Sequence, residues 1–227
     1  MNGFVHHVAR VRTLSFDCYG TLIDWKKGLG EAITSLLGPS GESYRDPFYA
    51  AYVDCEAKLE AGPYRCYREI VTDAAREAAS RLGIRLHDDQ AGHVPLHLPT
   101  WKPFADTNGA LARLQSRFRL GVLSNIDRDL FAGTADHFDI EFDFVVTAED
   151  VRAYKPNVAH FQRLFKDHAD RETHLHVAQS LFHDGEPCAQ LGIPFVWINR
   201  YDDVPVGSAK PLAVFRDLHS LAIESAP

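Results

Sequence analysis

The chain has 227 residues, of which 24 are basic and 31 acidic, and 45% are hydrophobic, values typical of a globular protein. No apolar run approaches the roughly 18 residues that a spanning helix needs, and the first residues lack the pattern of a secretory signal. We therefore expect a cytoplasmic protein without a membrane partner, and the net charge of −7 argues against a nucleic-acid partner.

Short apolar segments rich in β-forming residues alternate along the chain with helical patterns. Amphipathic helical spacing covers 106–118 and 157–168. Alternation of strands and helices predicts a parallel sheet covered by helices on both faces, an α/β fold of Rossmann-like type. The strands are expected at 13–16, 120–123, 144–147, 174–178, 195–198 and 212–215.

The gap between the first two predicted strands is unusually long. About 100 residues separate Phe16 from Leu120, which is far more than a crossover connection needs. Helical patterns dominate that stretch, at 28–37, 47–60 and 67–82, with a loop expected at 37–43. We therefore predict a core domain of residues 1–24 and 103–227, with a helical cap domain inserted at 25–102.

Four predicted strands are followed by chemically reactive side chains. Asp17 follows the first strand and Ser124-Asn125 ends the second, whereas Lys155 and Asp184 come a few residues after the third and fourth. The carboxyl ends of parallel strands meet at one edge of the sheet, where open α/β folds bind their ligands. The pattern thus predicts a carboxylate, a hydroxyl, a cation and a second carboxylate in one crevice.

The segments DCYGTL, LSN, YKP and SLFHD resemble, in order, the four motifs of the haloacid dehalogenase superfamily. The resemblance covers essentially the whole chain. It implies that Asp17 is a covalent nucleophile, which forms an aspartyl intermediate that water then hydrolyses. It also implies that Lys155 keeps Asp17 ionised and oriented, because a nearby opposite charge favours the charged carboxylate.

Two departures separate the chain from the phosphatases of that superfamily. Tyr19 stands where phosphatases carry the Asp that protonates the leaving alkoxide, and a phenol is poorly matched to this task at neutral pH. Gln179 stands where they carry a metal-binding Asp. The resemblance therefore favours a metal-independent hydrolase without a cofactor, and Mg²⁺ is expected only if the phosphatase alternative holds.

The first motif and the segment WINR at 197–200 are instead similar to the L-2-haloacid dehalogenase branch. That resemblance implies that Asp17 displaces halide from a small 2-haloacid and that Asp184 helps to activate water. Thr21 and Ser124 would hold substrate or nucleophile, and Asn125 would help to bind the departing halide. Because dimers are common in this branch, a homodimer is an expected partner besides the small carboxylate substrate.

The chain also lacks groups that this branch uses. Its dehalogenases carry an Arg on the second cap helix, where residues 49–53 read YAAYV, and Phe161 replaces a Tyr. Arg45, Arg65 and Arg68 are the candidates to replace that missing cation. The leaving group therefore stays open.

Three alternatives remain beside dehalogenation. The SLFHD segment is also similar to azetidine-2-carboxylate hydrolases, and there His183 could protonate a departing amine. The second alternative is a Mg²⁺-dependent phosphatase, and the third is a binding module without catalysis. If the protein is an enzyme, we also expect its substrate to contact Tyr19, Ser180 and His183.

The cysteines and the remaining histidines suggest no metal site. The four cysteines are widely spaced without a CxxC pair, so the sequence supports neither a disulfide framework nor a zinc knuckle, and we expect reduced thiols. We expect Cys18, next to the nucleophile, to be a small buried side chain rather than a reactive thiol. His6 and His7 lack acidic or cysteine partners at ligand spacing.

Overall fold

The computed structural model describes residues 2–226, which form two compact units. The α/β unit comprises the chain up to Ile23, Pro103–Asn125 and the chain from Phe138 onward. The helical unit comprises Asp24–Lys102 and also Ile126–His137. Residues 126–137 therefore pack with the helical unit. The assignment of 25–102 alone as a separate domain stays a prediction. No helix within residues 2–226 is both long and apolar enough to cross a membrane.

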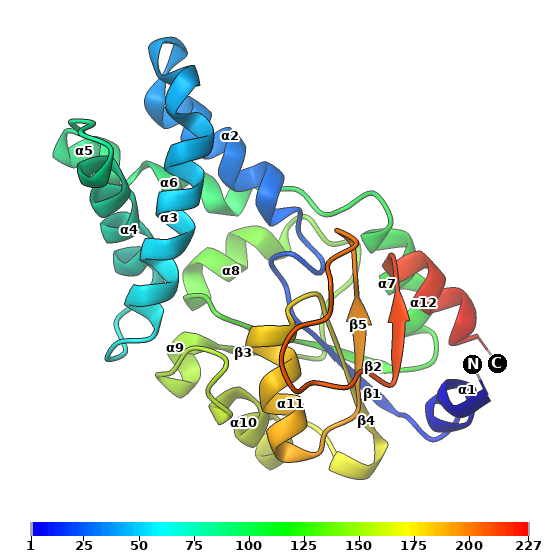
Figure 1. Cartoon of the computed structure of the whole chain (residues 1–227). Helices are drawn as coiled ribbons and strands as arrows, with labels where there is room; N and C mark the ends of the chain where they lie inside the picture. The colour runs from blue at the N-terminus through cyan, green and yellow to red at the C-terminus, as the bar shows by residue number, and fades with distance from the viewer. Residues whose placement is uncertain (1, 227) are drawn as a thin grey trace. The chain divides into compact units, whose positions relative to one another are not determined.

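A six-stranded sheet in the order β3-β2-β1-β4-β5-β6 forms the centre of the α/β unit, and every adjacent pair is parallel (Figure 1). Phe16 pairs with Val122 on one side and with Val177 on the other, so β1 is central. The residues that follow β1 therefore emerge between the ends of β2 and β4. The strands are β1 Thr13–Phe16, β2 Arg119–Ser124, β3 Phe144–Thr147, β4 His174–Ala178, β5 Phe195–Ile198 and β6 Ala213–Phe215. The predicted α/β class and strand positions are confirmed.

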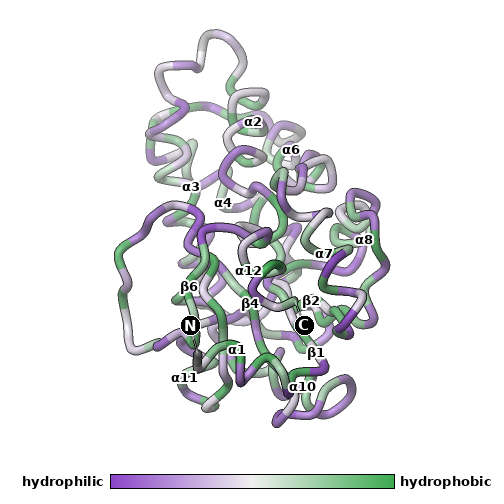
Figure 2. Tube along the Cα trace, turned by 90° about the vertical axis from the view of Figure 1, so that its right-hand side faces the viewer, coloured by the Kyte–Doolittle hydropathy of each residue, from purple (hydrophilic) through white to green (hydrophobic). Residues whose placement is uncertain are grey.

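Helices flank this sheet on both faces and bury β1, β4 and β5 along their length, whereas β6 at the edge leaves Val214 exposed. Figure 1 shows α7 and α12 on the side opposite α10 and α11. Phe161 and Leu164 of α10 pack in one core with Leu123 and Phe144 of the sheet, as the amphipathic pattern predicted. The strands are mainly hydrophobic along their length (Figure 2). The helices of this unit are α1 Asn2–Val8, α7 Thr107–Gln115, α9 Ala148–Val151, α10 Ala159–Asp167, α11 Glu186–Leu191 and α12 Leu218–Glu224, with the short turns η3 Arg171–Thr173 and η4 Leu181–Gly185.

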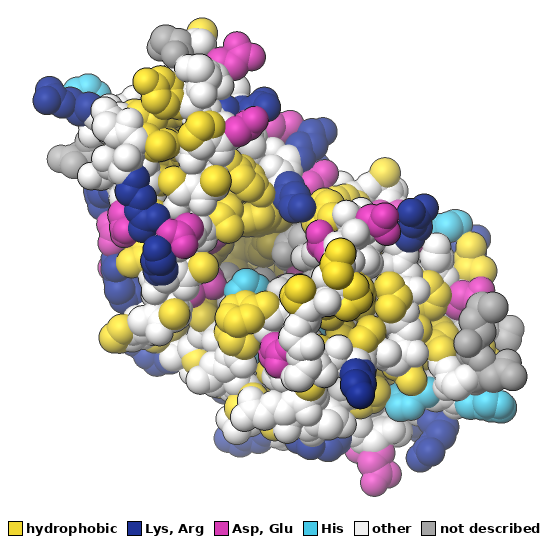
Figure 3. Space-filling model, in the orientation of Figure 1, with side chains coloured by type: hydrophobic (Ala, Val, Ile, Leu, Met, Phe, Trp, Pro, Cys, Tyr) yellow, Lys and Arg dark blue, Asp and Glu magenta, His cyan; other side chains and the backbone are white. Residues whose placement is uncertain are grey.

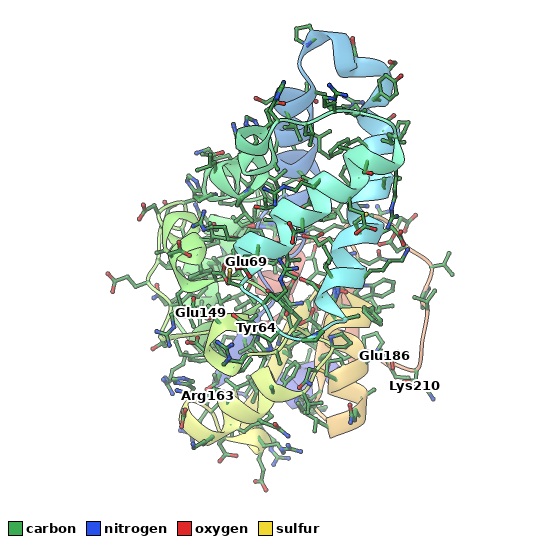
Figure 4. All side chains as sticks on the ribbon, turned by 90° about the vertical axis from the view of Figure 1, so that its left-hand side faces the viewer. Tyr64, Glu69, Glu149, Arg163, Glu186 and Lys210 are labelled. Carbon is green, nitrogen blue, oxygen red and sulfur yellow. The ribbon has the colours of Figure 1, made fainter. Side chains whose placement is uncertain are left out.

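The long connection between β5 and β6 is fixed to the start of α11. Figure 4 labels Glu186 on that helix and Lys210 on the connection. The Glu186 carboxylate accepts hydrogen bonds from the Ser208 amide and hydroxyl, both at 2.8 Å. The connection therefore has polar anchors although several of its own side chains, such as Val204 and Val206, are exposed.

The helical unit differs from its prediction in one loop. Residues 37–43 were expected to be irregular, but Pro39–Tyr44 forms a 3-10 helix, η1. Pro39 begins this short helix after Gly38, whose φ of 65° ends the preceding helix in a conformation that suits glycine. The other elements of the unit are α2 Trp25–Leu37, α3 Arg45–Glu60, α4 Tyr67–Arg81, α5 Asp88–Ala91, α6 His93–His97, η2 Leu98–Thr100 and α8 Arg128–Ala135.

Asp127 explains why the segment after β2 groups with the helical unit. Its carboxylate accepts the Tyr67 amide at 2.7 Å and the Arg68 amide at 2.8 Å, so it caps the first turn of α4. An acidic side chain at a helix start also interacts favourably with the helix dipole. The chain thus supplies the cap of α4 from a segment about 60 residues away in sequence.

Outward-facing charges of the helical unit form ion pairs with one another. Figure 3 shows Lys and Arg side chains adjacent to Asp and Glu on its surface. The three arginines considered as replacements for the dehalogenase Arg belong to these pairs. Arg65 pairs with Asp73, Arg68 with Asp129 and Arg45 with Asp46. Figure 4 labels Glu69, a second partner of Arg65. Each of the three candidates therefore already has a carboxylate partner within its own unit.

Candidate active site

Asp17 leaves the end of β1 on a tight turn. Gly20 has a φ of 97° and its amide donates to the Ile23 carbonyl at 2.8 Å. A side chain is strained at such a φ, so glycine is the residue that permits the turn. The turn returns Thr21 to the Asp17 carboxylate, four residues back in the chain.

Lys155 binds both acids of the predicted site. Its ammonium donates to Asp17 Oδ1 at 2.9 Å, to Asp184 Oδ1 at 2.7 Å and to the Leu123 carbonyl at 2.9 Å. An ammonium has three N–H donors, so every one of them has an acceptor. The cluster confirms the expected proximity of a cation and two carboxylates at the strand ends.

Burial and charge act in opposite directions on this cluster. Burial alone would lower the pKa of Lys155, but the carboxylates of Asp17 and Asp184 raise it above its ordinary value. Burial would raise the pKa of Asp184, whereas Lys155 and His176 lower it. Lys155 is therefore held as the ammonium and Asp184 as the carboxylate.

Thr21 completes the surroundings of Asp17. The Thr21 hydroxyl donates to Asp17 Oδ2 at 2.7 Å and accepts the Gln179 amide at 2.9 Å. Each oxygen of Asp17 therefore accepts a hydrogen bond, Oδ1 from Lys155 and Oδ2 from Thr21. The Asp17 side chain is 11% exposed, whereas those of Lys155 and Asp184 are 1% and 0% exposed. Asp17 is the member of the cluster that a ligand can reach.

Asn125 fixes the backbone of Lys155. Its Oδ1 accepts the Lys155 amide at 2.7 Å and its Nδ2 donates to the Lys155 carbonyl at 3.1 Å. This pair of bonds ties the end of β2 to the segment after α9. The sequence did not predict this contact, although the Asn and the Lys were both expected in the site.

Ser124 presents a hydroxyl at the end of β2. The residue is 1% exposed, and its Oγ finds no hydrogen-bond partner among residues 2–226. His160 reaches the Ser124 carbonyl with Nε2 at 3.2 Å. Burial, and then Lys155, lower the pKa of His160 to about 3, so this histidine is neutral near pH 7.

The remaining predicted contacts lie around the turn after β4. His183 donates its amide to Ser180 Oγ at 3.0 Å, and its Nδ1 lies 3.2 Å from the same oxygen. Burial lowers the pKa of His183. Tyr19 is half-buried in the turn after Asp17, where it forms a β-bridge with Ile23. The charges of Asp184, Lys155 and Asp17 also act on the pKa of His183, so this histidine lies near the cluster in space.

Sequence reasoning missed several residues that support the site. Arg200 donates to the Thr21 carbonyl through Nε at 3.0 Å and Nη2 at 2.8 Å, and it pairs with Asp106. Behind Asp184, His176 Nε2 lies 3.0 Å from Oδ1, and His176 Nδ1 lies 2.7 Å from Ser15 Oγ. Polar residues inside otherwise apolar strands were the available signal for Ser15 and His176, because an interior strand position is ordinarily apolar.

Cys18 is buried as expected. It is 0% exposed, and burial followed by the charge of Asp17 raises the pKa of its thiol. A thiol with a raised pKa is a poor nucleophile. Within the described residues, no group of three or more His, Cys, Asp or Glu side chains is arranged to hold a metal ion. Independence of metals stays a prediction.

Known proteins share both the sequence pattern and this fold. The haloacid dehalogenase-like hydrolase family matches residues 11–177. An (S)-2-haloacid dehalogenase of Pseudomonas putida is 25% identical, with 93% of this chain and 95% of the relative covered. One of Pseudomonas fluorescens is also 25% identical, with 91% and 93% covered.

Solved structures extend the likeness to the fold. The L-2-haloacid dehalogenase of Xanthobacter autotrophicus, solved with chloropropionic acid covalently bound, has a TM-score of 0.79 to this chain. It is 17% identical, with 94% of this chain and 97% of that chain covered. The family match spans most of the chain, including Asp17 and Lys155, and with the parallel sheet it shows that this protein belongs to the haloacid dehalogenase-like hydrolases.

Proposed function

We propose that the protein hydrolyses a small L-2-haloacid to the 2-hydroxy acid through an ester of Asp17. The observation that carries the proposal is the Asp17 carboxylate, which is partly exposed and held by Lys155 and Thr21. A carboxylate fixed in this way can approach a carbon electrophile without first losing rotational freedom.

In the first step an oxygen of Asp17 attacks C2 of the haloacid. A C–O bond forms, the carbon–halogen bond breaks, and the halide leaves with the bonding electron pair. Halide departure requires no proton, so Tyr19 does not need to act as an acid. Lys155 and Thr21 orient the nucleophile, and Lys155 keeps it ionised, since the ammonium lies 2.9 Å from Oδ1.

In the second step water attacks the carbonyl carbon of the Asp17 ester. The ester C–O bond breaks, the 2-hydroxy acid departs, and Asp17 is regenerated as the carboxylate. The net reaction releases one halide and one proton for each water consumed. Asp184 is our candidate to orient this water, because its Oδ2 is buried and has no hydrogen-bond partner among the described residues.

Ser124 and Asn125 are the proposed contacts of substrate and halide. The unpartnered Ser124 hydroxyl can donate to the substrate carboxylate, and Asn125 lies at the end of the same strand, bound to the Lys155 backbone. Tyr19, Ser180 and His183 remain proposed contacts. We propose no metal and no organic cofactor for this reaction.

The relatives support this choice of substrate. The two Pseudomonas proteins are named (S)-2-haloacid dehalogenases, and the Xanthobacter structure carries chloropropionic acid covalently bound. Both observations fit a covalent reaction on a 2-haloacid. The cytoplasmic location and the homodimer stay predictions.

A substrate panel tests the proposal. L-2-chloropropionate, azetidine-2-carboxylate and p-nitrophenyl phosphate are incubated with the protein, with and without EDTA, and chloride, ring-opened product and phosphate are measured. We expect chloride release that is insensitive to EDTA. EDTA-sensitive phosphate release would overturn the proposal in favour of a phosphatase, and ring opening without chloride release would change the leaving group.

Asp17→Asn tests the nucleophile, with Asp139→Asn, an exposed acid of the same unit, as the control. We expect chloride release to fall by at least about 10³-fold in the first variant, because loss of a nucleophile removes the covalent route. A single turnover in H₂¹⁸O should place ¹⁸O in the Asp17 peptide of the wild type, detected by mass spectrometry. Label found in the product alone after one turnover would overturn covalent catalysis.

A further inference from the structure

Three polar side chains occupy the interior of the central strands behind the site. Ser15 of β1 and His174 and His176 of β4 are each 0% exposed. Ser15 Oγ lies 2.8 Å from His174 Nε2 and 2.7 Å from His176 Nδ1, and His176 Nε2 lies 3.0 Å from Asp184 Oδ1. The residues form a continuous buried chain that ends on a carboxylate of the proposed site.

His174 is the member of this hydrogen-bonded series farthest from Asp184, and its surroundings determine which atoms of the series carry protons. Burial lowers the pKa of His174 to about 3, so His174 is neutral near pH 7 and has one N–H. Its Nδ1 finds no partner among the described residues, whereas its Nε2 contacts Ser15. A buried N–H without an acceptor costs more than a bare nitrogen, so the proton belongs on Nε2.

The positions of the Ser15 hydroxyl proton and the His176 ring proton follow from this assignment. If His174 Nε2 donates to Ser15 Oγ, the Ser15 hydroxyl must donate to its second neighbour, His176 Nδ1. His176 Nδ1 is therefore an acceptor without a proton, and the single ring proton of His176 lies on Nε2. That proton is directed at Asp184 Oδ1, because a carboxylate accepts hydrogen bonds and does not donate them.

The series of hydrogen bonds from His174 to His176 thus determines which oxygen of Asp184 accepts hydrogen bonds. Oδ1 receives two charge-assisted hydrogen bonds, from Lys155 at 2.7 Å and from His176 at 3.0 Å. Oδ2 receives none from the described residues. Lys155 contacts Asp17 as well, whereas His176 does not, so His176 is the partner that acts on Asp184 separately from the nucleophile.

We propose that His176, fixed in its Nε2–H tautomer by Ser15 and His174, is a positioning residue for Asp184. It keeps Oδ1 occupied, so that Oδ2 is the oxygen offered to the attacking water. This inference rests on the proposed function, because it assigns His176 to the second step of that reaction. Phe161 and Phe165 pack edge-on against the rings of His176 and His174, which restricts their rotation.

The tautomer can be measured without any substrate. ¹⁵N NMR of protein labelled at histidine distinguishes a protonated from a bare ring nitrogen, and the spectrum of His176→Gln assigns the signals of His176. We expect a proton on Nε2 of His176 and none on Nδ1. A proton on Nδ1, or a doubly protonated ring, would overturn the inference whatever the protein hydrolyses.

A pair of substitutions tests the effect on the reaction. His176→Leu removes the donor to Asp184, whereas His176→Gln keeps an amide N–H near the position of Nε2. We expect His176→Leu to lower kcat roughly 10–100-fold with little change in KM, since a hydrogen bond to a charged group is lost. His176→Gln should restore most of kcat. The step affected should be ester hydrolysis, so the Asp17 ester should accumulate in His176→Leu and be visible by mass spectrometry.

His168→Leu is the matched control. His168 stacks on Phe144 of the same sheet and has no bond to Ser15, His176 or Asp184 among the described contacts. Ser15→Ala provides a second way to disturb the tautomer if His176→Leu does not fold, with a smaller fall in kcat expected. An unchanged kcat in folded His176→Leu would overturn this inference, whereas wild-type protein inactive on every haloacid would overturn the proposed function and leave the tautomer result standing.

Discussion

Asp184 in the α/β unit and Glu56 in the helical unit are both buried acids, yet their pKa values move in opposite directions. Asp184 has a cation, Lys155, at 2.7 Å and the His176 N–H at 3.0 Å, and its pKa is lowered. Among the described residues, Glu56 accepts hydrogen bonds from two phenols, Tyr67 at 2.6 Å and Tyr52 at 3.5 Å. Burial outweighs these hydroxyls and raises the pKa of Glu56 to about 7.

The comparison teaches that burial does not determine the charge of an interior acid. A cation within hydrogen-bond distance compensates for lost hydration, whereas neutral donors compensate for it only in part. The α/β unit therefore keeps ionised groups in its interior at the site, whereas the helical unit buries Glu56 with a proton below about pH 7. Variants of each cluster should separate these two cases.

Removing the cation should have the largest effect. In Lys155→Met the carboxylates of Asp17 and Asp184 lose their shared partner, and we expect unfolding free energy to fall by about 3–5 kcal/mol, with turnover lost. Urea unfolding followed by circular dichroism measures the change. Lys166→Met, at an exposed position on α10, is the control and should leave both quantities near wild type.

Adding Asp184→Asn to Lys155→Met should recover part of the lost stability, because it removes one of the uncompensated buried charges. Activity should not return, since the proposed nucleophile and water sites both stay incomplete. If the double variant were less stable than Lys155→Met, the charge explanation for Asp184 would be wrong.

The second prediction concerns Glu56. Below its ordinary pKa of 4.5 both folded and unfolded protein carry the Glu56 proton. Between about 4.5 and 7 the folded protein retains the proton that the unfolded chain loses, so stability decreases as pH rises. Glu56→Gln should remove this decrease and be up to about 3 kcal/mol more stable than wild type at pH 8, relative to pH 4.5.

Urea unfolding at several pH values between 4.5 and 8 measures that effect. The control is Glu31→Gln, in which the replaced side chain is 70% exposed and lies 4.0 Å from Lys27. Its pH dependence should match the wild type. Equal pH slopes in wild type and Glu56→Gln would show that Glu56 is already ionised in the fold.

The two tyrosines beside Glu56 give a smaller and graded test. Tyr67→Phe removes the 2.6 Å hydrogen bond and should cost about 1 kcal/mol, while it raises the pKa of Glu56 further. Tyr52→Phe removes a bond of 3.5 Å and should have less effect on both quantities. The reverse order would indicate that Tyr52 is the principal donor.

Exposed ion pairs should matter least. Arg81 pairs with Asp54 and Glu77 on the surface of the helical unit. Water screens such charges, so Arg81→Met should change Tm less than Tyr67→Phe does, and added salt should reduce the difference. A larger change than that of Tyr67→Phe would mean that the surface network contributes more than the buried hydroxyl.

Much of the site could be predicted from the sequence because each group follows a strand. Asp17, Lys155 and Asp184 were expected together, and the Lys155 ammonium does bind both acids. Ser15, His174 and His176 could not be placed, since their contacts depend on the pairing of β1 with β4, which are more than 150 residues apart. The hydrogen bond between Asn125 and the Lys155 backbone could not be predicted either, because it joins segments that are distant in sequence.

The sequence by itself determined the α/β class, the strand positions and the family, because hydrophobic periodicity and short motifs are local properties of the chain. The tertiary structure decided which acid is charged. Asp184 and Glu56 are both carboxyl groups in locally regular segments, and only long-range packing brings Lys155 to one and phenols to the other. Electrostatic energy depends on the distance between charges and on their burial, and the local sequence pattern determines neither of them.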